Sequence, residues 1–192
     1  MPYVTPTVVA SGDVATAAAW NVLTNDVINL RALANVVGTT KTDTFSESVV
    51  AGGSSALVTG LTATITPTSA TSKVLVHGFI SVGLSVNNDQ RVFVRLERNQ
   101  PSASTLVAVG DAAGNRRRMT GTGAIVALED MPCVAFAVLD SPASTSAIIY
   151  SITLGHSSGI TRTVYVNQSG ADANATTSAR GASSIIVQEI PA

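Results

Sequence analysis

Residues 92–97 read VFVRLE, which places the apolar side chains of Val92, Val94 and Leu96 on one face of an extended chain. Successive side chains of a β-strand point to opposite faces, so this alternation predicts a strand with one buried side. Residues 148–154, IIYSITL, repeat the pattern. Because both segments are rich in β-branched and aromatic residues, the sequence indicates a mainly β fold.

Segments with the same period follow one another from residue 44 to residue 190. The predicted strands are residues 44–50, 57–66, 73–86, 91–98, 105–110, 124–128, 134–140, 146–156, 162–167 and 183–190. Turn-forming residues such as Asn87-Asn88-Asp89 and Asp140-Ser141-Pro142 lie between them, with no helical pattern in the series. Short strands at this spacing predict an antiparallel two-sheet β-sandwich of jelly-roll type.

The N-terminal part follows another pattern. Residues 1–12 are expected to form an extended arm, because Pro2 and Pro6 disfavour helix. One short α-helix comes next. The chain is therefore expected to divide into an arm-and-helix segment for oligomerisation or attachment, residues 1–40, and a β-sandwich domain, residues 41–192.

The helix is predicted from about Val14 to Val36. Asp13 is the expected N-cap, and Gly38 lies where a left-handed residue ends many helices. Apolar residues at spacings of 3, 4, 3 and 4 form a seam like the a and d positions of a coiled coil. The seam residues are Trp20, Leu23, Val27, Leu30 and Ala34.

Two interpretations of this seam are open. The helix either packs on its own domain or pairs with copies of itself. Two features favour self-association, namely the terminal position of the helix and the polar segment 38–43, which is expected to act as a connector. The seam residues are therefore predicted to be oligomerisation residues.

Charged residues make up only 12% of the chain, and the net charge is −1. A chain with so little charge has no general attraction to nucleic acid or to anionic membranes, so neither is predicted as a partner. Low charge also means little repulsion between copies, which suits a protein that buries surface against itself.

One cluster of charge stands out at Arg116-Arg117-Arg118. The forked donors of arginine can hold phosphate, carboxylate or an acidic protein surface, so these residues are candidate partner contacts. The alternative is a solvated loop, or arginines that pair with acids of this chain. Three arginines are too few for a footprint on duplex nucleic acid.

Residues for catalysis are scarce. His77 and His156 are the two histidines, and neither accompanies a Gly-x-Ser-x-Gly elbow. Glu129 and Asp130 are adjacent, so in a strand they would point to opposite faces. Cys133 lies in the apolar run CVAFAV and is expected to be buried. The chain is predicted not to be an enzyme.

No cofactor or structural metal is predicted, because one cysteine and two distant histidines cannot supply a zinc site. Asp111, Asn115, Asp172 and Asn174 offer loop oxygens without the spacing of a calcium loop. Whether a loop binds calcium or glycan stays open at this point.

Several short motifs resemble small bacteriophage virion proteins with a β-sandwich domain. Residues 9–21, VASGDVATAAAWN, and residues 30–33, LRAL, resemble the N-terminal segment that leads into a short oligomerising helix in that group. Later motifs are similar in the same order. They are ITPTSATSKVLV at 65–76, GDAAGNR at 110–116, LDSP at 139–142 and RGASSIIVQEI at 180–190.

This resemblance implies a homotrimer located in a virion. The group includes trimeric head decoration (cement) proteins as well as tail-fibre and tailspike tip domains. The expected function is therefore a decoration protein on the outer surface of the head, with the major capsid protein as its partner. The alternative is a tip in the tail that recognises a host surface receptor, either glycan or protein.

Overall fold

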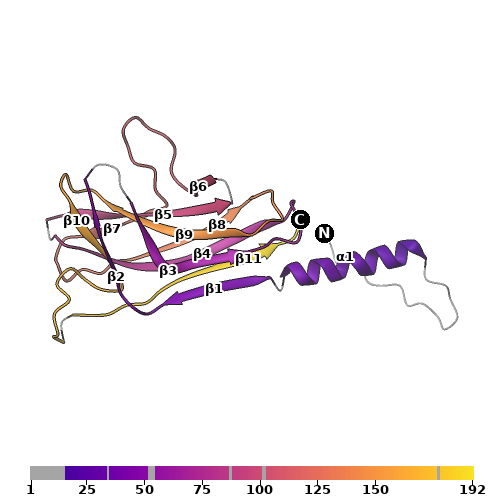
Figure 1. Ribbon diagram of the computed structural model, residues 1–192, viewed down its shortest axis with the longest axis horizontal. Coiled ribbons are helices and arrows are strands. Elements are labelled where there is room, and N and C mark those ends of the chain that lie inside the picture. Colours follow the sequence, from indigo (N-terminus) through magenta and orange to yellow (C-terminus); the bar gives the residue numbers. More distant parts are fainter. Residues whose placement is uncertain (1–15, 34, 52–54, 87, 101–102, 177) are drawn as a thin grey trace.

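The computed structural model describes residues 16–192, apart from residues 34, 52–54, 87, 101–102 and 177. The described residues form a helix followed by strands (Figure 1). The elements are α1 (Ala17–Leu33), β1 (Val36–Lys41), β2 (Phe45–Val49), β3 (Ala56–Ile65), β4 (Lys73–Leu84), β5 (Gln90–Gln100), β6 (Ala103–Val107), β7 (Gly121–Ile125), β8 (Cys133–Asp140), β9 (Ile148–His156), β10 (Arg162–Val166) and β11 (Ser183–Ile190).

The strands form two antiparallel sheets, which confirms the predicted β-sandwich. The first sheet has the order β1-β11-β4-β10-β2, with β8 along the other edge of β4, and the second has the order β3-β9-β5-β6, with β7 beside β6 along β5. The pairs are nested, since β1 pairs with β11, β2 with β10, β3 with β9 and β4 with β8. Nested pairs distributed over two sheets are the jelly-roll arrangement.

Alternating apolar residues fill the space between the sheets. Val92, Val94 and Leu96 of β5 are at most 1% exposed, as their alternation predicts. Strand β3 contains a bulge, and Gly60 there has a φ of 78°, which keeps apolar residues on the inner face on both sides of the irregularity. The hydroxyl of Thr39 in β1 donates to the Thr62 carbonyl of β3 at 2.6 Å, joining the sheets along one side.

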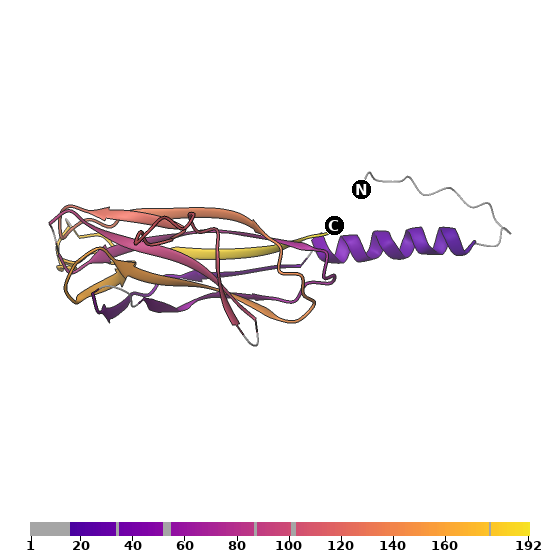
Figure 2. The ribbon, with the colours of Figure 1, turned by 90° about the horizontal axis from the view of Figure 1, so that it is seen from above.

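Helix α1 extends from one end of the sandwich, roughly along its long axis (Figures 1 and 2). The Thr16 hydroxyl accepts a hydrogen bond from the Ala19 amide at 3.2 Å, and the Thr16 carbonyl accepts the first helical bond from Trp20. Thr16 therefore caps the helix. The predicted cap, Asp13, and the predicted arm lie outside the described residues.

Two boundaries predicted for the helical region are wrong. The helix ends at Leu33 rather than Val36, and Gly38 lies inside β1 instead of ending the helix. The segment predicted as a polar connector, 38–43, is largely strand, because Val36 to Lys41 pair with β11 residue by residue. The predicted division at residue 40 thus falls within β1, while the assignment of separate roles to the helix and the β body remains a prediction.

Most of the ten predicted strands lie within a few residues of those observed. Strand β7 begins earlier than predicted, at Gly121, and β1 was not predicted at all. The prediction that Cys133 is buried is wrong, since its side chain is exposed. Cys133 pairs with Ser81 in β4, and the inward position next to it belongs to Val134.

Candidate self-association site

The apolar seam of α1 is open to solvent in the single chain. Trp20 is 61% exposed, Leu23 48%, Val27 54% and Leu30 65%. Ala34, the fifth predicted seam residue, lies outside the described residues. Among the described residues, the seam side chains therefore do not pack on the chain's own β-sandwich, and their self-association stays a prediction.

Apolar side chains also lie away from the seam. Val22 is 37% exposed and Ile28 44% exposed, and both lie outside the sector that holds the seam residues. Asp26 and Arg31 are the only charged residues between Ala17 and Leu33. A helix that is apolar on several sides is normally buried on several sides.

A buried carboxylate holds the junction between α1 and the sandwich. Glu189 of β11 accepts hydrogen bonds from the Asn35 amide group at 2.8 Å and from the Thr68 backbone and hydroxyl at 2.8 and 2.7 Å. The Glu189 backbone amide donates to the Asn35 carbonyl at 3.0 Å. Asn35 lies between α1 and β1, so these bonds fix the residue from which the helix leaves the body.

The environment of Glu189 has two opposite effects on the pKa of its carboxyl group. Burial raises the pKa, whereas the hydrogen bonds from Asn35 and Thr68 lower it, and the result is a pKa below the ordinary value. The carboxylate is therefore the form that the folded junction favours.

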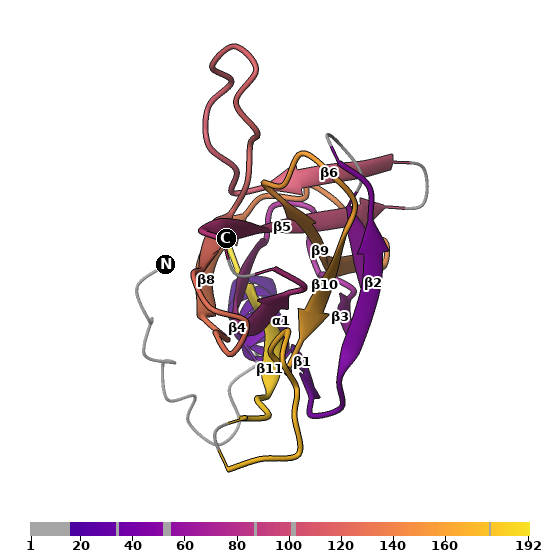
Figure 3. The same ribbon diagram turned by 90° about the vertical axis from the view of Figure 1, so that its left-hand side faces the viewer.

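The predicted arginine cluster lies in the long loop between β6 and β7, which projects from the sandwich (Figure 3). Arg118 donates from Nε to the Gly110 carbonyl at 2.7 Å, and Arg116 donates to the Ala113 carbonyl at 3.4 Å. The Arg117 guanidinium lies 5.5 Å from the centre of the Phe93 ring. Each of the three side chains thus has its own local partner, in the loop or in β5. These contacts do not bring the three guanidinium groups together into one binding site.

Sequence reasoning missed a polar bridge between the sheets. Arg98 of β5 contacts both carboxylate oxygens of Asp140 in β8 at 2.8 and 2.7 Å, and the Tyr150 hydroxyl of β9 donates to the same carboxylate at 2.7 Å. Burial, followed by the neighbouring Asp140 carboxylate, raises the pKa of Tyr150. The one signal in the sequence is Arg98, which continues the inward positions of Val94 and Leu96 in β5.

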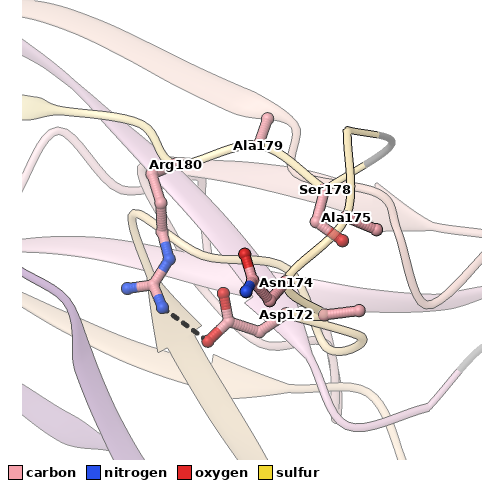
Figure 4. Close-up of a pocket in the computed structure, with 7 residues that line it drawn as sticks. Asp172, Asn174, Ala175, Ser178, Ala179 and Arg180 are labelled. Atoms are coloured by element: carbon pink, nitrogen blue, oxygen red, sulfur yellow. Dashed lines mark hydrogen bonds and ion pairs between the residues drawn. The ribbon is translucent and has the colours of Figure 1, made fainter.

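A small polar hollow lies in the segment between β10 and β11, at the end of the sandwich opposite α1 (Figures 1 and 4). Arg180 and Asp172 form an ion pair across it at 2.7 Å, and Asn174 and Ser178 also line it. Asp111, another residue with a side-chain oxygen that could bind calcium, lies in the projecting β6–β7 loop. The hollow offers hydrogen-bonding groups with a single carboxylate.

The two histidines occupy different environments. His156 is 2% exposed, and its Nε2 lies 2.9 Å from the Val49 carbonyl oxygen, a contact that anchors the end of β9. His77 is half-buried and pairs with Ala137 across β4 and β8. Among the described residues, the His156 ring has no hydrogen bond to a Ser, Thr or Cys side chain.

Across the part of the chain that the structure describes, no three His, Cys, Asp or Glu side chains gather where they could hold a metal ion. Within the same described residues, no helix has the length and apolar character needed to cross a membrane.

No protein-family model matches the sequence, and a comparison with curated proteins gives no match. Among solved structures, that of the Gx strain of infectious bursal disease virus matches with a TM-score of 0.42 and 14% identity, over 81% of this chain and 36% of that chain. The VP2 subviral particle of the same virus matches with a TM-score of 0.36 and 14% identity, over 81% and 37%. The chain thus spans little more than a third of these solved structures, and at these scores no role is transferred from them.

Proposed function

We propose that this chain is a virion structural protein that assembles as a homotrimer through α1 and decorates the outer surface of a phage head. The observation that carries the proposal is the exposed apolar seam of a helix that extends from a complete jelly-roll body. Trp20, Leu23, Val27 and Leu30 are each about half exposed or more. The phage-like motifs supply the virion setting and the expected number of copies.

Exposed apolar area gives the driving force for assembly. Burial of a leucine- or valine-sized side chain stabilises by roughly 1.5–3 kcal/mol. Four seam residues in each copy would together offset a substantial part of the entropy lost on association. Val22 and Ile28 correspond to positions c and b of the same heptad pattern, so a bundle built on the seam would leave both of them on its outer side.

A decoration protein stabilises the head by binding to it. A protein that binds the assembled shell and not the free subunits stabilises the shell by an amount set by its concentration and affinity. In this proposal the N-terminal segment contacts the major capsid protein, and the sandwich projects outward. The Glu189 junction would hold each body in a fixed direction relative to the bundle.

A second candidate is a receptor-binding tail-fibre or tailspike tip. The polar hollow with Asp172 and Arg180 favours it, because the hollow lies at the end opposite α1, where a tip would meet a host surface. Sparse aromatic residues, 4% of the chain, weigh against a site that stacks on sugar rings.

Phage particles prepared without this protein provide the test. Purified full-length protein is added back, and its position and copy number are measured by electron microscopy and quantitative mass spectrometry. Decoration predicts hundreds of copies on the head and greater resistance of the head to heat. The Leu23→Asp variant, which should not trimerise, should bind far more weakly. Copies confined to the tail would contradict decoration and support the tip.

A further inference from the structure

The outer face of the first sheet is mainly apolar over β4 and β8. On β4 and β8, the outward positions pair Leu75 with Leu139, His77 with Ala137 and Phe79 with Ala135. Phe79 is 40% exposed and Leu139 50% exposed. This half of the face presents small or apolar side chains, and His77 is its one titratable group besides Cys133 and Lys73 at the ends.

Strands β11 and β1 extend the same face. Ile186 pairs with His77 on one side and with Gly38 on the other, and Gln188 pairs with Leu75 and with Val36. Val36 is 49% exposed and lies at the start of β1, directly after the Asn35 junction. The apolar face therefore begins at the base of the helix.

The outer face of the second sheet differs in chemistry. Its outward positions on β5 include Arg95 and Glu97, and these residues pair with Thr153 and Ser151 of β9. The Thr153 hydroxyl donates to the Glu97 carboxylate at 2.8 Å. Both faces carry exposed apolar side chains, such as Ile149 at 42% on the second sheet. The second face also carries charged side chains along the middle of β5, whereas the face over β4 and β8 has small or apolar residues around His77.

The helix seam alone is short for a stable assembly. The 17-residue α1 is about 25 Å long, and its seam covers little more than two heptads, fewer than a sustained coiled coil has. A stable interface buries roughly 800 Å² on each partner. Four strands spaced about 4.8 Å apart, each with several outward residues, add a face of roughly 400–500 Å². The helix seam and the sheet face together provide an area close to the roughly 800 Å² that each partner buries in a stable interface.

We infer that the outer face of β1, β11, β4 and β8 packs against a second copy of this chain and forms the second part of the self-association interface. The inference rests on the proposed trimer. Because α1 extends along the long axis of the sandwich and the Asn35–Glu189 bonds fix the junction, parallel helices would bring the bodies alongside one another (Figure 2). The face that continues from the helix is then the one that meets its neighbour.

Cys133 provides a native probe of this face. It is the only cysteine of the chain and is exposed at an outward position of β8. Its rate of reaction with a thiol reagent is compared between the native wild-type protein and Leu23→Asp, with the mass of each measured by light scattering. We expect at least tenfold slower labelling in the wild-type trimer than in a dissociated variant. Equal rates in a wild-type trimer and a monomeric variant would overturn the inference and leave the helix-based proposal intact.

Substitution on the face provides the second measurement. Ala137→Glu adds a charge at the centre of the face, and Thr64→Glu adds the same charge at an exposed outward position of β3 on the second sheet. We expect Ala137→Glu to raise the dissociation constant of the trimer at least tenfold and Thr64→Glu to leave it unchanged. Equal dissociation constants for the two variants would overturn the inference. A monomeric wild-type protein would refute the proposed trimer itself.

Discussion

Two carboxylates inside the sandwich are each saturated with hydrogen-bond donors. Asp140 receives Arg98 and Tyr150 from the opposite sheet, and Glu189 receives Asn35 and Thr68 at the base of the helix. A buried charge is tolerated only with such partners, since removal of one partner leaves the other uncompensated. These residues therefore join β5, β8 and β9 across the core and hold Asn35 at the base of the helix.

Asp140→Asn is expected to destabilise the protein by about 3 kcal/mol, because it leaves the Arg98 charge without a counter-ion in a site where both side chains are at most 15% exposed. Urea unfolding measures the change. Asp172→Asn is the matched control, because its ion pair has the same 2.7 Å distance but side chains that are 57% and 30% exposed, and less than about 1 kcal/mol is expected. Similar losses for the two variants would contradict the structural role of Asp140.

Glu189→Gln should lower stability by about 1–3 kcal/mol at pH 7, because it removes a charged acceptor from three donors. The folded pKa of Glu189 lies below its ordinary value of 4.5, so this contribution is present above about pH 4.5 and is lost as pH falls through the lowered pKa. The difference in unfolding free energy between wild type and variant should therefore shrink from pH 7 to pH 3. The exposed Glu47→Gln is the control, and a pH-independent difference would count against the junction as described.

At the scale of elements, the proposed trimer gives α1 partners from other copies of the chain. Isolated helices of about this length are marginal in water, and most helical stability comes from packing of an apolar face. Trp20, Leu23, Val27 and Leu30 lie on one side of the observed helix and are exposed, while their role in oligomerisation stays a prediction. The apolar pattern is the same for a helix packed on its own body and for one packed on a copy, so only the exposure of Trp20 and its neighbours separates the two.

Leu23→Asp should release Trp20, the only tryptophan, into water. We expect a red shift of the emission maximum and loss of helical circular dichroism, while the β body keeps a cooperative unfolding transition, at a temperature lowered only by the loss of the trimer contacts. Asn25→Asp adds the same charge on the opposite side of the helix and should leave both signals in place. If Leu23→Asp instead shifted the emission and destabilised the β body while the mass of the protein in solution stayed the same, the helix would be packed within its own chain.

Strand β1 is an element that local sequence patterns do not predict. Val36 and Val37 continue the apolar helix pattern, and Gly38 resembles a helix end, so local reasoning placed these residues in the helix and its connector. What decides their conformation is pairing with β11, about 150 residues later in the chain. The bridge of Arg98, Asp140 and Tyr150 escaped prediction for the same reason, since its partners come from three strands.

For the molecule as a whole, alternation predicted the fold class and most strand positions, because a half-buried strand must place every second side chain inward. The nested pairing of β1 with β11, β2 with β10 and β3 with β9 is long-range, and no local pattern specifies it. The low charge of the chain has a structural counterpart in one apolar sheet face and one apolar helix, both at the surface of the single chain.

Self-association through α1 is the central claim, and the mass of the full-length protein in solution tests it most directly. Light scattering on purified protein at micromolar concentration is expected to give three times the 19.5 kDa mass of one chain, and the Leu23→Asp variant is expected to give a lower mass. A wild-type mass of one chain at that concentration would contradict the account.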